Sequence, residues 1–251
     1  MGCLEKIALV TGGSRGIGAA TVARLAREGF SLCVNYRSNQ ATAESAVNQA
    51  RSSGVAAIAV RADVSDDRDV ERLFERIDQD LGKITALVNN AGILAPQMRV
   101  EEMSAVRINR ILTTNVTSAF LCCKHAIKRM STRHGGMGGS IVNVSSAASR
   151  IGSAGEYVDY AASKGAIDTL TRGLALELAD EDIRVNGVRP GFIHTDMHAD
   201  GGEPDRIEKL AGAIPMQRGG TAAEVANAIA WLLSDEASYT TGSFIDAAGG
   251  R

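Results

Sequence analysis

The chain has 251 residues, of which 45% are apolar and 22% charged, and its formal net charge at neutral pH is −2. This length accommodates one sizeable α/β domain with a large core. The balanced composition excludes a disordered chain, and the small net charge excludes the strong positive field typical of nucleic-acid-binding proteins.

Short apolar segments of strand length alternate along the chain with longer segments of helical period, which is typical of repeated βα units around a parallel sheet. We therefore predict an α/β fold of Rossmann type, a doubly wound parallel sheet of about seven strands in a single domain, 1–251. The expected strands are 7–10, 31–36, 56–61, 85–89, 140–144, 184–188 and 243–246. The expected helices are 17–28, 41–53, 68–81, 105–130, 160–179 and 222–233.

A glycine-rich turn follows the first expected strand and opens the first expected helix, which is the position of a dinucleotide-binding turn. Glycines permit close approach of the backbone, and a helix N-terminus offers free N–H donors and a partial positive charge to a pyrophosphate. A purely structural left-handed turn has a similar glycine spacing, but this position favours phosphate binding. The predicted cofactor-binding residues of the turn are Gly12, Ser14, Arg15, Gly16, Ile17 and Gly18.

The second expected strand ends in Asn35-Tyr36-Arg37-Ser38, without the carboxylate that accepts from the ribose 2′-hydroxyl of NAD. Arg37 instead suits a charge-assisted bond with the 2′-phosphate of NADP, and Arg15 is expected near the same group. The alternative is that Arg37 is an ordinary surface charge. The sequence therefore favours NADP as the cofactor, with NAD as the alternative.

Tyr160 and Lys164 lie four residues apart at the start of the expected helix 160–179, so their side chains share one helix face. A nearby cation favours the ionised phenol and lowers its pKa from about 10 toward neutral pH. A tyrosine with such a pKa is an effective proton donor and acceptor. The same spacing occurs by chance in many helices, so it needs the support of further motifs.

Several motifs accompany this pair. They are the glycine-rich turn, Asn89-Asn90-Ala91-Gly92, Ser145-Ser146 and Arg189-Pro190-Gly191, in this order along the chain. The combination resembles the short-chain dehydrogenase/reductase family over essentially the whole chain, and most closely its bacterial branch of 3-oxoacyl-carrier-protein reductases and glucose 1-dehydrogenases. The resemblance implies that the protein interconverts a ketone or aldehyde and an alcohol by hydride transfer, acts on a small-molecule substrate and forms a homotetramer.

The resemblance also implies the catalytic roles. Tyr160 becomes the acid/base, Lys164 the partner that lowers its pKa and binds the nicotinamide ribose, and Ser146 the group that holds the substrate oxygen. Asn115 matches an active-site asparagine that holds a water in the proton relay. Ser146 lies fourteen residues before Tyr160, one more than the commonest family spacing, and Ser145 is the alternative, since only one of two successive strand residues faces the site.

The resemblance further implies contacts with each part of the cofactor. The implied positions are Asp63 and Val64 for the adenine, Asn89 and Gly92 for the adenosine ribose, Ile193 and Thr195 for the carboxamide and phosphate side, and Pro190 and Gly191 of the Arg-Pro-Gly motif. Tyr160 and Lys164 complete the predicted cofactor-binding set.

The helix and strand pattern breaks down over 194–215, which we predict to be a lid over the substrate. Within it His194 and His198 are four residues apart and would share a helix face. Catalytic zinc needs three protein ligands, and the sequence offers no obvious third, so no metal is expected.

The chain enters its first expected strand within six residues and contains no apolar run of membrane-spanning length, so we expect a cytoplasmic protein without a membrane or nucleic-acid partner. Cys3, Cys33, Cys122 and Cys123 show no CxxC spacing and are expected to be reduced packing thiols. A non-catalytic nucleotide-binding sensor or scaffold of the same fold is the alternative function. A damaged Tyr/Lys/Ser set would indicate it, and here the set is complete.

Overall fold

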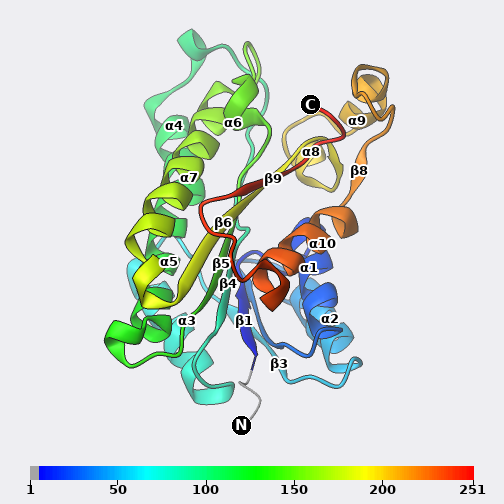
Figure 1. Cartoon of the computed structure of the whole chain (residues 1–251). Helices are drawn as coiled ribbons and strands as arrows, with labels where there is room; N and C mark the ends of the chain where they lie inside the picture. The colour runs from blue at the N-terminus through cyan, green and yellow to red at the C-terminus, as the bar shows by residue number, and fades with distance from the viewer. Residues whose placement is uncertain (1–5) are drawn as a thin grey trace.

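The computed structural model describes residues 6–251 as a seven-stranded parallel sheet with helices on both faces (Figure 1). The strands lie in the order β3-β2-β1-β4-β5-β6-β9, which confirms the predicted doubly wound α/β fold. The sheet strands are β1 (Ile7–Val10), β2 (Ser31–Tyr36), β3 (Ala57–Arg61), β4 (Ala86–Asn89), β5 (Gly139–Val144), β6 (Ile183–Pro190) and β9 (Phe244–Ala247). A separate two-stranded ribbon pairs β7 (Ile193–His194) with β8 (Gly220–Thr221).

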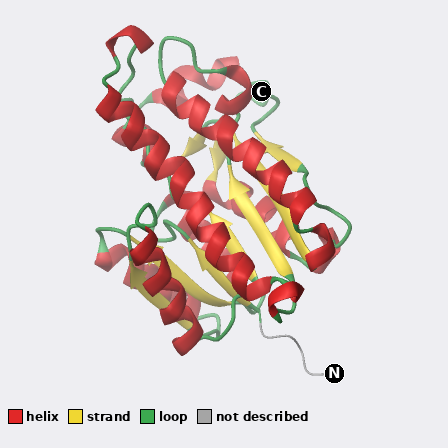
Figure 2. Ribbon diagram, turned by 90° about the vertical axis from the view of Figure 1, so that its left-hand side faces the viewer, coloured by secondary structure: helices red, strands yellow, loops and turns green. Residues whose placement is uncertain are grey.

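The helices include the expected ones in the predicted chain order, together with short helices at 148–151, 197–200 and 206–210 that are outside the expected set. They are α1 (Gly16–Ala26), α2 (Gln40–Arg51), α3 (Asp67–Asp80), α4 (Ala105–Leu112), α5 (Ser118–Met130), α6 (Ala148–Ile151), α7 (Val158–Glu177), α8 (Met197–Asp200), α9 (Arg206–Leu210) and α10 (Ala222–Leu233). Figure 2 faces the side on which α4, α5 and α7 cross in front of the strands. No helix within residues 6–251 has the length and apolar character needed to cross a bilayer.

Both faces of the central strand β1 are buried. Ala8 and Val10 face the core beneath α1, α2 and α10, whereas Ile7 and Leu9 face the core beneath α3, α5 and α7. Successive strand residues point to opposite sides of a sheet, so a strand covered on both faces is apolar throughout. This packing explains why the strand segments lack polar alternation.

The carboxyl ends of β1, β2 and β4 meet at one edge of the sheet. Val10, the last residue of β1, is paired with Val34 on one side and Val88 on the other. The connection after β1 leads to β2 on one side, and the connection after β4 leads to β5 on the other, which is where doubly wound sheets open a crevice for ligands. The turns that follow these strands therefore surround one space.

The expected helix 105–130 is interrupted in the structure. Between α4 and α5 the residues Thr113–Thr117 form a π-helical turn, and Asn115 in this turn is buried. A π turn inserts one extra residue without changing the apolar pattern on either side, so periodicity alone did not predict it.

The cysteines within the described residues are free and buried: Cys33, Cys122 and Cys123. Burial raises the pKa of all three thiols, which keeps them protonated at neutral pH. They therefore pack as small apolar side chains, as predicted, whereas Cys3 lies outside the described residues.

Candidate active site

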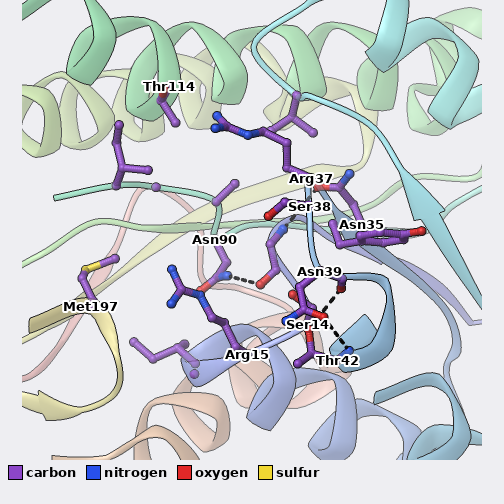
Figure 3. A pocket seen from close by; sticks show the side chains of 18 of the residues that line it. Ser14, Arg15, Asn35, Arg37, Ser38, Asn39, Thr42, Asn90, Thr114 and Met197 are labelled. Atoms are coloured by element: carbon purple, nitrogen blue, oxygen red, sulfur yellow. Dashed lines mark hydrogen bonds between the residues drawn. The ribbon is translucent and has the colours of Figure 1, made fainter. Parts of the chain in front are cut away.

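A cavity of about 580 Å³ opens at the carboxyl edge of β1, β2 and β4 (Figure 3). Its walls come from the glycine-rich turn, the end of β2, the turn after β3, the segment after β4 and the start of the lid. The predicted cofactor residues that line it are Gly12, Ser14, Arg15, Gly16, Ile17, Arg37, Asp63, Val64, Gly92 and Thr195. Sequence segments far apart in the chain are thus brought to one space.

The glycine-rich turn is too tightly packed for side chains. Gly12 and Gly16 have φ angles of +60° and +54°, and a Cβ on Gly18 would lie 2.3 Å from the Gly12 carbonyl oxygen. No side chain caps the N-terminus of α1, where Arg15 is the N-cap residue. Backbone N–H groups of the first helical turn therefore remain available to an anion.

Two asparagines that the sequence analysis did not single out hold this turn. The Asn35 Oδ1 atom accepts from the Gly12 N–H at 3.3 Å, and the Asn90 Nδ2 atom donates to the carbonyl oxygens of Thr11 and Gly12 at 2.9 and 3.2 Å. Figure 3 shows both side chains at the turn. A polar residue at the carboxyl end of an otherwise apolar strand is the sequence signal that identifies such positions.

Arg37 lies at the cavity with a mostly exposed side chain, and its guanidinium is 3.8 Å from the Asp63 carboxylate. Burial raises the pKa of Asp63, but hydrogen bonds from Ser65 and the charge of Arg37 outweigh this and lower the pKa below its usual value. Asp63 is therefore an anion at neutral pH, and Arg37 has a weakly bound counter-charge rather than a buried partner.

Arg15 contacts the lid. Its guanidinium lies 2.5 Å from the Asp200 carboxylate of α8 and 3.9 Å from the Asp196 carboxylate. Arg15 also lines the same cavity as Arg37, so its guanidinium borders both the lid and the predicted cofactor space. Its role toward the cofactor stays a prediction.

A second cavity of about 460 Å³ adjoins the first and shares Ile17, Asn90, Thr195 and Met197 with it. The predicted site residues on its walls are Ser146, Tyr160, Lys164, Pro190, Gly191 and Ile193. The rest of the wall is largely apolar or aromatic, including Leu94 and Phe192. A ligand in the first cavity would therefore reach Tyr160 and Lys164 where the two cavities meet.

The Lys164 ammonium is buried beside Tyr160. Its Nζ atom donates to the Val144 carbonyl oxygen at 2.8 Å and lies 5.6 Å from the centre of the Tyr160 ring. Burial raises the pKa of Tyr160 to about 12, and a hydrogen bond with the Ser146 side chain lowers it. This net direction is opposite to the lowering expected from the sequence, because desolvation of the phenol dominates and the ammonium faces Val144.

The two adjacent serines have different environments. Ser145 is buried, and its hydroxyl donates to the Lys164 backbone carbonyl at 3.1 Å. The Ser146 hydroxyl accepts from the Ala148 N–H at 3.1 Å and reaches the Tyr160 hydroxyl. Ser146 is therefore placed to contact a ligand beside Tyr160, while Ser145 supports α7.

Asn115 ties the segment after β4 to α7. Its Oδ1 atom accepts from the Ile93 N–H at 2.8 Å, and its Nδ2 atom donates to the Ile93 carbonyl at 3.0 Å and the Ser163 hydroxyl at 3.1 Å. A Cβ on Gly92 would lie 3.4 Å from this Oδ1 atom and 3.6 Å from the Lys164 Nζ atom. Asn115 thus lies close to the pair, and its part in a proton relay stays a prediction.

Asn89 is a predicted site residue whose side chain points away from both cavities. Its side chain is buried and donates to the Asn143 Oδ1 atom at 2.9 Å and the Cys123 sulfur at 3.2 Å. It lies outside the residues that line the two cavities. Because a strand residue faces one side of the sheet, Asn89 points into the core while Asn90 holds the turn.

The predicted lid region contains α8 and α9. Burial lowers the pKa of His198, and the Nδ1 atom of His194 is 4.0 Å from the Glu208 carboxylate. Across residues 6–251 no three or more His, Cys, Asp or Glu side chains gather as a metal site.

The fold and these motifs define a class of oxidoreductase. A family model described as enoyl-(acyl carrier protein) reductase matches residues 12–251. A solved short-chain type dehydrogenase/reductase from Mycobacterium marinum superposes with a TM-score of 0.91 at 32% sequence identity, over 98% of this chain and 94% of that one. The chain belongs to the short-chain dehydrogenase/reductase family.

Individual relatives are similar over nearly their whole length. The chain is 62% identical to the uncharacterized oxidoreductase YgfF of Escherichia coli, over 98% of this chain and 99% of that one. It is 36% identical to the 3-oxoacyl-[acyl-carrier-protein] reductase FabG of Staphylococcus aureus, over 98% of each chain. It is also 36% identical to glucose 1-dehydrogenase 2 of Bacillus subtilis, over 98% of this chain and 94% of that one.

Proposed function

We propose that the protein is an NADP(H)-dependent oxidoreductase that interconverts a ketone or aldehyde and an alcohol. The observation that carries this proposal is the pair of adjoining cavities, one built around a glycine-rich turn at a helix N-terminus and the other around Tyr160. Such a site suits a reaction in which a dinucleotide in the first cavity and a small carbonyl compound in the second meet where the two cavities join.

The residues of the first cavity fit a nicotinamide dinucleotide. The tightly packed glycine turn brings its backbone to the cavity, and the uncapped α1 N-terminus would provide N–H donors to a pyrophosphate. The exposed Arg37 supports the phosphorylated form, and NAD stays the alternative. When bound, the cofactor supplies or accepts the hydride.

Tyr160 serves as the proton donor in the proposed reduction. With a pKa raised to about 12 the phenol holds its proton at neutral pH, and Ser146 beside it orients a carbonyl oxygen toward that proton. Lys164 adds positive charge to the same wall, which stabilises the developing alkoxide. Relatives of the chain are named for different substrates, 3-oxoacyl-[acyl-carrier-protein] and glucose, so both compound classes belong among the substrates to be tested.

The test is oxidation of NADPH, followed by absorbance, against a panel of 3-oxoacyl thioesters, sugars and small ketones. We expect turnover with at least one member and faster turnover with NADPH than with NADH. Tight NADPH binding without turnover of any member would instead support the non-catalytic sensor.

A further inference from the structure

Basic side chains gather around one aromatic ring in the wall of the second cavity. The guanidinium carbons of Arg206 and Arg251 each lie 5.5 Å from the centre of the Phe192 ring, and the His198 ring centre lies 6.3 Å from it. These four residues line the second cavity together with Tyr160, and none of the four lines the first cavity. The basic groups therefore face the space proposed for the carbonyl substrate rather than the space proposed for the cofactor.

Arg206 is a buried member of this cluster, and its charge is paired. Its side chain is 11% exposed, and its Nη1 atom donates to the Oε1 atom of Glu156 at 3.2 Å while its Nη2 atom donates to Oε2. The guanidinium carbon also lies 5.0 Å from the centre of the Tyr157 ring. A buried charge is costly without a partner, and Glu156 supplies one. The charge of Arg206 is thus balanced within the protein.

Arg251 has no such partner. Within residues 6–251 its guanidinium forms neither an ion pair nor a side-chain hydrogen bond, and it lies against the Phe192 ring. The cations that line the second cavity are Lys164, Arg206 and Arg251, whereas Glu156 is the one carboxylate among the described lining residues. Because Glu156 already pairs with Arg206, the cavity has a surplus of positive charge.

The histidine of the cluster does not carry this surplus charge. Burial lowers the pKa of His198, the positive charges of Arg206 and His194 lower it further, and the charge of Glu208 acts in the opposite direction with the smallest effect. The imidazole is therefore neutral at neutral pH. The charge that is free to meet a ligand beside Phe192 comes from an arginine.

The backbone that carries Arg251 is fixed beside the lid (Figure 1). Gly249 and Gly250 have φ angles of +65° and +96°, a left-handed turn that glycine adopts without strain. The Gly249 carbonyl oxygen accepts from the Met216 N–H at 3.1 Å, and the Nη2 atom of Arg150 donates to the Arg251 carbonyl oxygen at 3.3 Å. The turn and these hydrogen bonds bring residue 251 back to the cavity wall.

We propose that the second cavity selects a carbonyl substrate that itself carries an anionic group, a carboxylate or a phosphate, and that Arg251 binds this group beside the Phe192 ring. A planar guanidinium forms two parallel hydrogen bonds with either group. The inference rests on the proposed function, because it names the class of compound that is reduced beside Tyr160. The preference for an anionic ligand in binding does not depend on any reaction.

The test compares ligands that differ only in charge: straight-chain oxo acids, in which the carbonyl lies at increasing distances from the carboxylate, and their primary amides. With NADPH we expect the native chain to favour the acid in at least one pair by about tenfold in kcat/KM, the scale of a charge-assisted hydrogen bond. Arg251→Gln should lose this preference and still reduce the amide at the native rate. The phosphate ester of a hydroxy ketone, compared with the parent ketone, decides between the two anionic groups.

Two further variants show whether the effect belongs to the charge at this position. Arg251→Lys should keep a preference for the acid, because the positive charge remains. Arg27→Gln removes an equal charge from an exposed residue at the end of α1 and should leave the preference unchanged. Equal kcat/KM for anionic and neutral ligands in the native chain, or a preference that survives in Arg251→Gln, would overturn the proposal.

Binding separates this proposal from the proposed function. The same acids and amides are titrated by saturation-transfer NMR into the full chain with NADP⁺, which cannot reduce a carbonyl. Tighter binding of the acid that is lost in Arg251→Gln, without turnover of any ligand by NADPH, would support the anion site and reject the proposed function. Reduction of neutral carbonyls by a chain that binds acid and amide equally would retain the proposed function and reject the anion site.

Discussion

At Lys164 and Tyr160, burial rather than mutual attraction dominates the protonation equilibria. Desolvation lowers the pKa of the amine to about 8 and raises that of the phenol to about 12. Burial thus favours the neutral form of both groups, so a charge on either of them lowers the stability of the folded protein. Active sites commonly hold such destabilised groups, and removing them often makes a protein more stable and less active.

Replacement of Lys164 by methionine should therefore stabilise the protein. Lys164 has a pKa of 10.5 in the unfolded chain and of about 8 in the folded protein. Below pH 8 the amine is charged in both states, so folding bears the full cost of burying the charge. This cost disappears as the pH rises from 8 to 10.5, because the folded protein then releases the proton. We expect Lys164→Met to raise the free energy of unfolding at pH 7 by about 1–3 kcal/mol. Urea unfolding at pH 7 and pH 10 measures this. The exposed-site control Lys128→Met should show no such difference, and a Lys164→Met gain of equal size at both pH values would refute the explanation.

Cofactor preference is a second property of a single residue. Arg37→Asp removes the cation proposed to bind a 2′-phosphate and supplies a carboxylate that accepts from a ribose hydroxyl. The ratio of kcat/KM for NADPH over NADH should fall at least tenfold and reverse toward NADH. Arg27→Asp, an equal change of charge on an exposed residue at the end of α1, should leave the ratio unchanged. Unaltered discrimination in Arg37→Asp would show that the phosphate is recognised elsewhere.

At the level of single residues, the sequence predicted which residues line the candidate active site better than it predicted their side-chain contacts. Ser146, Tyr160 and Lys164 meet on one cavity, as their positions in the chain predicted. Asn89 does not, because which side of a strand a residue faces depends on where the strand begins. The pKa of Tyr160 depends on burial, which no local pattern reveals.

Among the segments of the fold, the lid (194–215) is the one whose contacts could not be predicted from the sequence. Its α8 is joined to the glycine turn through Asp200 and Arg15, and its α9 to the segment before α7 through Arg206 and Glu156. Both ion pairs link residues far apart in the chain, and the lid has no periodic apolar pattern. The π-helical turn before α5 was missed for a related reason, since a single inserted residue leaves no periodic signal.

The Arg15 pair predicts how the lid affects cofactor binding. Asp200 and a cofactor phosphate would compete for the same guanidinium, so Asp200→Asn should tighten NADPH binding by about two- to fivefold, the scale of an exposed ion pair. Fluorescence titration of NADPH measures the affinity. Asp205→Asn, which changes another exposed lid carboxylate, is the control. Weaker NADPH binding by Asp200→Asn would mean that the pair assists the cofactor instead.

For the whole molecule, the alternation of apolar and helical segments predicted the doubly wound parallel sheet and the positions of its strands along the chain. Observed bounds differ from the expected ones by a few residues, as with β6, which extends to Pro190. The expected strand stopped at Val188 because proline has no N–H to donate to a strand ladder, whereas in the structure Pro190 is the last residue of β6, opposite Ala247 of β9.

The predicted homotetramer is also a property of the whole molecule. One side of the sheet is covered by α4, α5 and α7 (Figure 2). These helices expose Val106 on α4, Phe120 on α5 and Leu176 on α7, with exposed fractions of 78%, 51% and 84%. A Cβ on Gly165 or Gly173 of α7 would meet nothing within 4 Å, so this surface permits close approach of another helix. Light scattering should give a tetramer for the native chain and a smaller species for Phe120→Glu. A monomeric native chain would contradict the prediction.

The most direct test of the proposed function is single-turnover oxidation of bound NADPH by Tyr160→Phe with a saturating carbonyl substrate. Loss of the phenolic proton should slow the reaction at least a hundredfold while NADPH affinity stays near that of the native chain. Tyr239→Phe, the same change at a fully exposed tyrosine, should react at the native rate. Equal rates for Tyr160→Phe and the native chain would contradict the account.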